Sequence, residues 1–297
     1  MTSVLTLISP STGHLTDAIV ATTTRGLERA GATLDRREWL SEGEACDLFF
    51  SDADEKTCNR IIRHDLLGEL IDIVAQPVNG RRKKLLLADM DSTLVTSETL
   101  DELAEHAGLK DRISEITARA MNGEIAFEGA LHERVSLLRG LPEDALAKTM
   151  ERIDYSPGAE TLVRTMAAHG AYTALVSGGF SYFTGKVKAA LGFDFEIGNQ
   201  LEIKNGVLSG QVTGPIVTRD TKYETLLSLT RTRGLALSES MAVGDGANDL
   251  PMLQAAGTGV AYHAKPVVIK HAPYRLDFAG LDALLFIQGY RRQEFVC

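Results

Sequence analysis

Two aspartates stand two positions apart directly after a short apolar run, Leu85-Leu86-Leu87-Ala88, and Ser92 and Thr93 follow them. A run of this length and composition is typical of a buried strand in a parallel sheet. At the end of such a strand, the carboxylates of Asp89 and Asp91 repel each other and lose hydration unless a cation, or a reaction that uses their charge, compensates them. The alternative is an acidic turn in which Asp91 or Ser92 caps the next helix. This stretch alone favours neither interpretation.

Two further polar clusters also follow predicted strands. They are Ser177, Gly178 and Gly179 after a strand over 171–176, and Asp245, Asn248 and Asp249 after a strand over 240–244. In open α/β sheets, ligands bind at the carboxyl ends of the strands. Because three unrelated polar turns would have no reason to fall there together, we expect one oxygen-rich site, suited to Mg²⁺.

The same edge of the sheet has the parts of a phosphate site. Ser177, Gly178 and Gly179 offer a hydroxyl and bare backbone N–H groups before a predicted helix. Lys222 is expected to open the helix over 222–233 and to balance the charge of a phosphoryl group. Each feature alone has a simpler explanation, an ordinary turn for the first and a solvated lysine for the second.

The elements that must position these residues alternate between strands and helices. From Pro157 onward the alternation predicts a doubly wound parallel sheet of the Rossmann-like kind, with a hairpin through Asn205-Gly206. Residues 98–153 carry helical periodicity and no good strand signal. So many residues exceed what a crossover needs. We therefore interpret 98–153 as a helical cap inserted into a core that spans 81–297.

Residues 1–80 form a separate predicted unit with the order β-α-β-β-α-β. This α+β order is ferredoxin-like, and with Gly13 near the first strand–helix turn it resembles an ACT-like domain. The resemblance leaves two roles open, serine binding by this unit and a structural or dimerising appendage without a ligand. Residues 76–84 look like a linker, whose basic end is a solvated joint.

Composition narrows the function classes. The chain has 297 residues, 44% of them hydrophobic and 24% charged, as in ordinary globular proteins. No apolar run reaches the length of a membrane span, so we expect no membrane association. The net charge of -9 argues against a broad nucleic-acid surface. Three scattered cysteines without metal-ligand spacing indicate a reducing compartment, most simply the cytoplasm.

Together these residues resemble the haloacid dehalogenase-like (HAD) phosphohydrolases. The four motifs of that family correspond, in order, to Asp89-Met90-Asp91-Ser92-Thr93, Ser177, Lys222, and Gly244-Asp245-Gly246-Ala247-Asn248-Asp249. Further segments look like the phosphoserine phosphatases within it: Glu98-Thr99-Leu100-Asp101-Glu102, Met121-Asn122-Gly123-Glu124, Phe127, Arg134-Val135-Ser136-Leu137-Leu138, Ser177-Gly178-Gly179-Phe180, and Gly214-Pro215-Ile216-Val217.

The resemblance implies hydrolysis of O-phosphoserine, the last step of serine biosynthesis, through an aspartyl-phosphate. Asp89 is then the nucleophile and Asp91 the general acid and base. It also implies Mg²⁺ held by Asp89, the backbone carbonyl of Asp91 and Asp245, with Asp249 supporting them. The phosphoryl oxygens would contact Ser177, the Gly178 amide, Lys222 and Asn248.

The resemblance also assigns the cap residues. Glu98 would meet the substrate ammonium, and Arg134 its carboxylate, which suits a bidentate guanidinium. Phe127 would shield the site. From the sequence pattern alone, Arg134 is more simply a charge on a helix surface, Glu98 a first-turn acid, and Phe127 a core aromatic.

Three alternatives remain open at this point. The first is a small-molecule phosphatase of the same superfamily with another cap specificity. The second is a phospho-acceptor protein that uses Asp89 as a switch, and the third an amino-acid sensor built on residues 1–80. The sequence also leaves a homodimer open.

Overall fold

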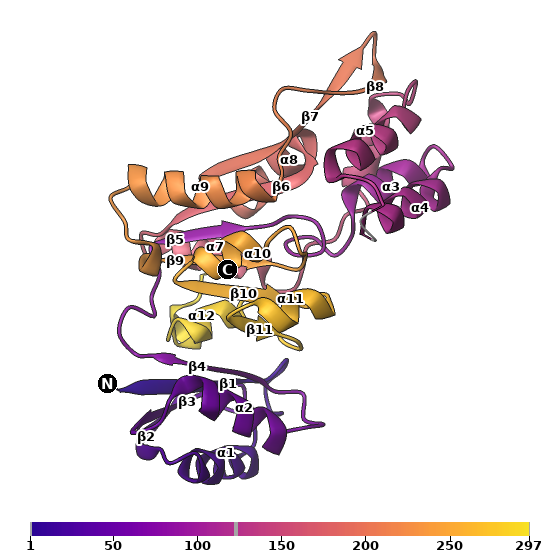
Figure 1. Ribbon diagram of the computed structural model, residues 1–297. Coiled ribbons are helices and arrows are strands. Elements are labelled where there is room, and N and C mark those ends of the chain that lie inside the picture. The colour runs from indigo at the N-terminus through magenta and orange to yellow at the C-terminus, as the bar shows by residue number, and fades with distance from the viewer. Residues whose placement is uncertain (1, 122–123, 297) are drawn as a thin grey trace.

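The computed structural model describes residues 2–121 and 124–296. Figure 1 shows three parts: an N-terminal α+β unit, a larger α/β core next to it, and a group of helices beyond the core. The two β-sheets are separate, one of four strands in the N-terminal unit and one of seven in the core.

The N-terminal sheet is antiparallel, with strand order β2-β3-β1-β4. Alternate residues of β1 point to opposite sides: Leu5 and Leu7 pack with the two helices of this unit, while Ile8 joins the core cluster. The elements are β1 (Ser3–Ile8), α1 (Asp17–Arg29), β2 (Thr33–Ser41), β3 (Ala45–Ser51), α2 (Glu55–Asp65) and β4 (Asp72–Pro77).

The predicted order of elements in this unit is therefore observed, with two differences in bounds. The sequence pattern predicts the second helix over 54–70, but the helix ends at Asp65, and Leu67 is exposed just beyond it. The fourth strand runs to Pro77 and so takes up the first residues of the predicted linker, because its backbone pairs along its whole length with β1.

The core sheet has the order β11-β10-β9-β5-β6-β7-β8 and is parallel except for the β7–β8 hairpin. Its strands are β5 (Leu85–Ala88), β6 (Tyr172–Phe180), β7 (Phe195–Lys204), β8 (Val207–Thr213), β9 (Ser240–Gly244), β10 (Thr258–Tyr262) and β11 (Tyr274–Leu276). The strand that ends in the two aspartates, β5, is the central one.

Helices cover both faces of this sheet, which confirms the doubly wound prediction. Leu85 and Leu87 of β5 belong to one buried cluster, and Leu86 and Ala88 belong to the other. The helices are α7 (Ala159–Ala168), α8 (Ser181–Leu191) and α12 (Ala283–Ile287) on the Leu86 side, and α9 (Arg219–Thr232), α10 (Leu250–Ala255) and α11 (Pro266–His271) on the Leu87 side. Two short 3₁₀ helices are η1 (Leu237–Glu239) and η2 (Arg292–Glu294).

Four helices lie between β5 and α7 in the chain and stand apart from the core in Figure 1. They are α3 (Thr99–Glu105), α4 (Lys110–Met121), α5 (Phe127–Leu137) and α6 (Asp144–Met150). The hairpin reaches them, since the backbone N–H of Gly140 donates to Leu208 of β8 at 2.8 Å. Asn205 and Gly206 in its turn have φ of 52° and 76°, as a type I′ turn requires.

Two local predictions were wrong. Ser177, Gly178 and Gly179 do not form a turn but continue β6 to Phe180, with a shift of the pairing with β7 between Val176 and Phe180. Lys222 does not open its helix, because Thr218 caps α9 four residues before it. Both changes move functional side chains deeper into the core, where Ser177 and Lys222 are each 1% exposed.

A buried polar junction joins the N-terminal unit to the core. Arg81 donates to both carboxylate oxygens of Asp47, at 2.6 and 3.2 Å, and to the backbone carbonyl of Phe286. The carboxylate of Asp72, at the start of β4, accepts three backbone N–H groups from residues 277–279. The junction therefore ties the first unit to the loop after β11.

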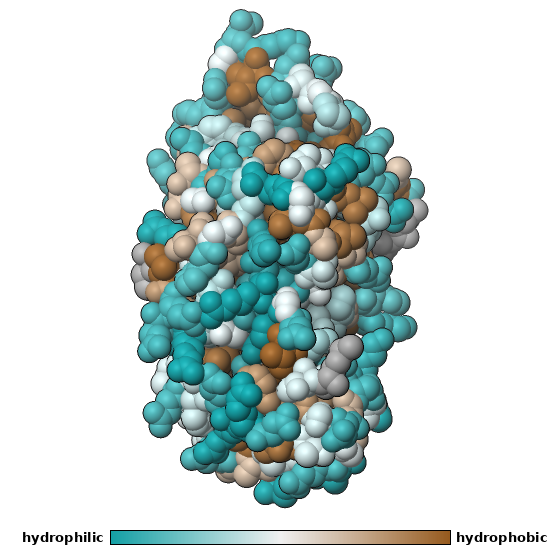
Figure 2. All heavy atoms as spheres, turned by 90° about the vertical axis from the view of Figure 1, so that its left-hand side faces the viewer, coloured by the Kyte–Doolittle hydropathy of each residue, from teal (hydrophilic) through white to brown (hydrophobic). Residues whose placement is uncertain are grey.

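The outer surface agrees with the composition. On the face shown in Figure 2, hydrophobic residues lie in small groups separated by hydrophilic ones. None of the helices in the described part of the chain has the length and apolar character needed to cross a membrane.

Candidate active site

The centre of the site is the carboxyl end of β5. Alternation along the strand puts Asp89 on the same side as Leu85 and Leu87, toward α9 and α10. Its backbone N–H donates to Val243 of β9 at 3.1 Å, which extends the pairing of the two strands to this residue. Asp89 is 5% exposed. The side chain is thus aimed into the sheet edge by the strand itself.

Three carboxylates converge there. Oxygens of Asp89, Asp245 and Asp249 all lie within 4.8 Å of one another, and all three residues are buried. Asp245 follows β9, the neighbour of β5, and Asp249 precedes α10. Residues 156 positions apart in the chain therefore meet because their strands are adjacent and parallel.

Lys222 supplies a buried positive charge to this group. Its Nζ lies 2.6 Å from Asp249 Oδ1 and 2.7 Å from Asp89 Oδ1. Burial alone would lower the pKa of Lys222, but the two carboxylates outweigh it and raise the pKa above its usual value. The lysine is thus charged and fixed between the two acids.

One lysine does not balance three acids. Burial, with the charge of Asp89, raises the pKa of Asp245 to about 6 and that of Asp249 to about 7. Carboxyl groups with pKa values raised this far indicate that a positive charge, which would stabilise their ionised form, is missing. An all-oxygen donor set of this kind suits a hard cation.

Close backbone packing brings Asp249 to the cluster. A Cβ at Gly244 would lie 2.4 Å from Asp249 Cγ, so only glycine permits this approach. Asp249 Oδ2 also accepts the backbone N–H of Gly246 at 3.0 Å. Asn248 belongs to the same loop, and its Oδ1 would lie 2.2 Å from a Cβ at Gly246.

Asp91 follows Asp89 by two residues and contacts the start of α3 and the residue Ser177 of β6. Its Oδ1 accepts the backbone N–H of Thr99 at 2.8 Å, and its Oδ2 accepts the hydroxyl of Ser177 at 3.3 Å. Burial, and then the charge of Glu98, raises the pKa of Asp91 to about 7. Asp91 can therefore both hold and release a proton near neutral pH.

The shifted pairing of β6 shapes the neighbouring backbone. Asn199 of β7 donates to the carbonyl of Gly178 at 2.7 Å, and the N–H of Gly179 donates to Ser177 Oγ at 2.9 Å. A Cβ at Gly179 would lie 2.6 Å from Asp91 Oδ2. Glycine at position 179 thus allows Ser177 and Asp91 to lie next to each other.

Both predicted cap residues interact electrostatically with Asp91. Glu98, just before α3, accepts the hydroxyl of Ser92 at 2.8 Å. Burial lowers the pKa of Arg134 on α5, while the carboxylates of Asp101, Glu98 and Asp91 act on it in the opposite direction. The predicted segment at 122–123 and the side chain of Phe127 lie outside the described part.

The family model for haloacid dehalogenase-like hydrolases matches residues 86–254, which include the three acids, Ser177 and Lys222. The chain belongs to the haloacid dehalogenase-like hydrolases.

Relatives within the family have a narrower description. A phosphoserine phosphatase of Streptomyces coelicolor is 44% identical over 228 residues, 77% of this chain. The match covers 56% of that relative, so this chain spans little more than half of its length.

Two solved structures resemble nearly the whole chain. A HAD family hydrolase from Salmonella enterica serovar Typhi has a TM-score of 0.85 at 31% identity, and covers 96% of this chain and 98% of its own. A probable phosphoserine phosphatase from Vibrio cholerae has a TM-score of 0.79 at 34% identity, with coverage of 98% and 88%. The N-terminal unit is thus shared with other HAD proteins.

Two residues that contact Asp245 were given no role from the sequence. The hydroxyl of Thr93 donates to Asp245 Oδ1 at 3.4 Å, and Lys265 Nζ lies 3.8 Å from Asp245 Oδ2. Lys265 comes shortly after β10, the strand next to β9. The rule that located the other residues, polar groups after parallel strands, could have found it as well.

Proposed function

We propose that this protein is a phosphoserine phosphatase that hydrolyses O-phospho-L-serine to L-serine and phosphate through an aspartyl-phosphate. The observation that carries the proposal is the pair at the end of β5. Asp89 is buried and held by Lys222, while Asp91, two residues on, has a pKa raised to about 7. The names of the relatives support the substrate.

The two acids would divide the chemistry. An oxygen of Asp89 attacks phosphorus, the bond from phosphorus to the serine oxygen breaks, and Asp91 gives its proton to that oxygen. A water then attacks phosphorus, Asp91 takes the proton of that water, and Asp89 leaves as a carboxylate. A group with a pKa near 7 can do both steps at neutral pH.

The phosphoryl oxygens would bind between β6 and α9. The hydroxyl of Ser177, the N–H of Gly178 and the ammonium of Lys222 are the donors, joined by Asn248 from the loop after β9. Fixed donors in a buried site stabilise transferred charge without reorganisation. The burial of Ser177 and Lys222 supports this role.

The carboxylate cluster would hold Mg²⁺. Asp89, Asp245 and the backbone carbonyl of Asp91 would be its ligands, with Asp249 supporting Lys222 and the loop. When bound, the ion supplies positive charge that screens the phosphate from these acids. The raised pKa values of Asp245 and Asp249 support a cation here.

The helices α3 to α6 would be the cap, bounded as predicted by about 98 and 153, over a core of residues 81–297. Glu98 would bind the ammonium of phosphoserine and Arg134 its carboxylate, so that the cap selects the substrate. The acids around Arg134 support a polar, charged subsite.

Residues 1–80 would form an ACT-like, ferredoxin-like domain. Its β-α-β-β-α-β order and four-stranded antiparallel sheet support this. The proposal also includes serine binding by this unit and a homodimer. It includes a cytoplasmic location, which agrees with the buried free thiols of Cys46 and Cys58.

Phosphate release from O-phospho-L-serine tests the proposal directly. We expect turnover with Mg²⁺ and its loss when a chelator is added. No release from phosphoserine, with release from other phosphomonoesters, would contradict the proposed substrate. A stable phospho-Asp89 without phosphate release would instead favour a phospho-acceptor protein.

A second candidate is a HAD phosphatase of another specificity. The family match supports it, because the model that matches residues 86–254 describes haloacid dehalogenase-like hydrolases in general and names no substrate. Turnover of phosphothreonine or phosphoglycolate above that of phosphoserine would favour this candidate.

A further inference from the structure

Arg134 is held by two neutral groups on the cap helices. Its Nε donates to the carbonyl of Ala130 at 3.2 Å, one turn earlier on α5, and its Nη1 donates to the hydroxyl oxygen of Thr117 on α4 at 3.3 Å. Thr117 commits its own hydroxyl hydrogen to the carbonyl of Ile113 at 3.0 Å. Its oxygen is therefore oriented as an acceptor toward Arg134.

This anchoring leaves part of the guanidinium open. Of five N–H groups, Ala130 and Thr117 take one each. Nη2 has no hydrogen-bond partner among the backbone groups and side chains that the structure describes, and Nη1 keeps one hydrogen. These donors lie on adjacent nitrogens, the arrangement that a carboxylate accepts bidentately.

Neutral anchors also leave the charge of Arg134 available. Arg81 shows the contrast, because it donates to both oxygens of Asp47 and is thereby neutralised. Asp101 and Glu98 attract Arg134 electrostatically. Without a fixed anchor, a long arginine side chain would turn toward these acids and away from a ligand.

We propose that Thr117 is a positioning residue for substrate specificity: it holds the guanidinium of Arg134 in the orientation that binds the carboxylate of phosphoserine. The inference rests on the proposed function and names a residue that the HAD motifs do not contain. It predicts an effect on substrates with a carboxylate and none on substrates without one.

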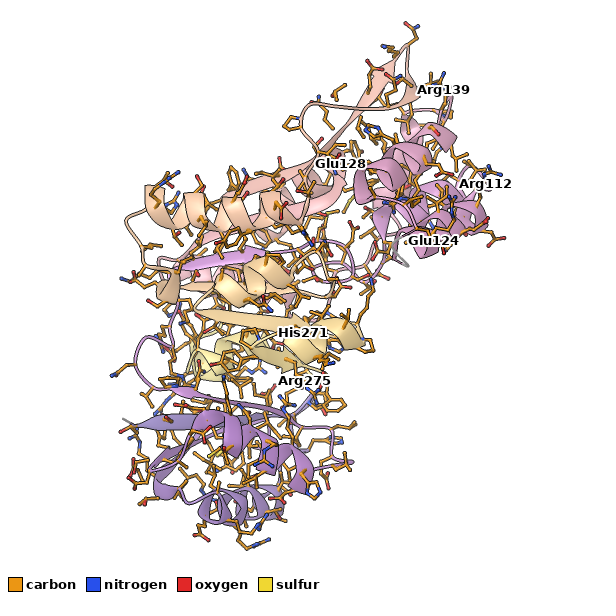
Figure 3. The ribbon with its side chains drawn as sticks, in the orientation of Figure 1. Arg112, Glu124, Glu128, Arg139, His271 and Arg275 are labelled. Carbon is orange, nitrogen blue, oxygen red and sulfur yellow. The ribbon has the colours of Figure 1, made fainter. Side chains whose placement is uncertain are left out.

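The cap offers a matched control on the same helix. Arg112 lies five residues before Thr117, about 140° around α4, and Figure 3 shows it on the outer edge of the cap. It is exposed. Arg112→Ala therefore removes an arginine from the cap without touching the Arg134 subsite.

The experiment compares Thr117→Val, which keeps the shape and removes the hydroxyl, with Thr117→Ser, which keeps the hydroxyl. Values of kcat and KM are measured on O-phospho-L-serine and on p-nitrophenyl phosphate, which has no carboxylate. We expect Thr117→Val to raise KM for phosphoserine roughly tenfold with kcat nearly unchanged, since a binding interaction is lost. Activity on p-nitrophenyl phosphate should stay the same.

Two further variants calibrate the result. Arg134→Ala should weaken the binding of phosphoserine far more than that of p-nitrophenyl phosphate. Thr117→Ser and Arg112→Ala should behave like the wild type with both substrates. A melting temperature for each variant, with the p-nitrophenyl phosphate activity, shows that the fold is intact.

The outcomes separate the two proposals. If the wild type hydrolyses phosphoserine and Thr117→Val leaves its KM unchanged, or lowers activity on both substrates equally, Thr117 only ties α4 to α5 and the inference is overturned. If the wild type hydrolyses p-nitrophenyl phosphate but not phosphoserine, the proposed function fails and the role of Thr117 fails with it.

Discussion

Lys222 and Asp249 form a fully buried ion pair, with Nζ 2.6 Å from Oδ1 and side chains that are 1% and 0% exposed. The pair joins α9 to the loop before α10, and the same ammonium reaches Asp89. A structural ion pair and a contact with the proposed nucleophile therefore share one nitrogen. This sharing fixes Asp89 relative to the loop after β9.

Lys222→Met should abolish turnover and destabilise the fold. Removing one partner of a buried pair leaves uncompensated charge and costs on the order of 3 to 5 kcal/mol. Because Asp249 has a pKa raised to about 7, its protonation should relieve part of this cost at pH 5.5. Urea unfolding at pH 8 and pH 5.5 measures the difference. Equal destabilisation at both values would contradict the assignment of the pair as charged.

Asp89→Asn should abolish phosphate release while the fold stays intact. The amide keeps the shape of the side chain, but cannot act as the nucleophile. It also removes one negative charge from a cluster that carries an excess of them, so the free energy of unfolding should not fall. Phosphate release and thermal unfolding are measured in parallel. Substantial residual activity in Asp89→Asn would contradict the assignment of Asp89 as the nucleophile.

The stability of the metal-free protein should depend on pH with a defined sign. Burial raises the pKa values of Asp245 to about 6 and of Asp249 to about 7, above the usual 3.8. A group with a raised native pKa favours the native state at low pH, and this contribution is lost as pH rises through the native pKa. In chelator, the melting temperature should therefore fall between pH 5 and pH 8.

Added Mg²⁺ should reverse this trend. The ion competes with protons for the same oxygens, so it should raise the melting temperature more at pH 8 than at pH 5. The control is Asp249→Asn, in which the pH dependence in chelator should be weaker. A Mg²⁺ effect that is equal at both pH values would argue against metal binding by these carboxylates.

Asp72→Asn should loosen the junction between the N-terminal unit and the core. The carboxylate accepts the N–H groups of Asp277, Phe278 and Ala279 at 2.6, 3.1 and 2.8 Å, and an amide replaces one acceptor oxygen by a donor. Losing hydrogen bonds to a charged group costs about 1.5 to 3 kcal/mol in the free energy of unfolding.

The junction lies close to the loop after β9 that carries Asp245, so activity should respond too. The ring Nε2 of His263 lies 3.0 Å from the carbonyl of Ala279, and the N–H of Lys265 donates to the carbonyl of Asp245 at 3.2 Å. We expect the Asp72→Asn variant to need a higher Mg²⁺ concentration for half-maximal activity. Asp35→Asn, on an exposed position of β2, is the control. Unchanged stability and Mg²⁺ requirement would show that the junction does not support the site.

The sequence by itself determined which functional side chains are present and at which edge of the sheet they meet. Apolar runs such as Leu85–Ala88 form strands for local reasons, and polar residues at the ends of parallel strands must share one edge of the sheet. Asp89, Asp91, Ser177 and Asp245 could be predicted on this basis. The order of elements in residues 1–80 followed from the same local periodicities.

Only the tertiary structure decided how these residues pair. The contact of Lys222 with Asp249 spans 27 positions, that of Ser177 with Asp91 spans 86, and that of Asp72 with the loop after β11 spans more than 200. Such contacts depend on how strands pair and helices pack, which no local pattern contains. Ser177 lies within a strand instead of a turn because β7 pairs with β6 on both sides of it, at Val176 and at Phe180. Thr117 meets Arg134 because α4 packs on α5.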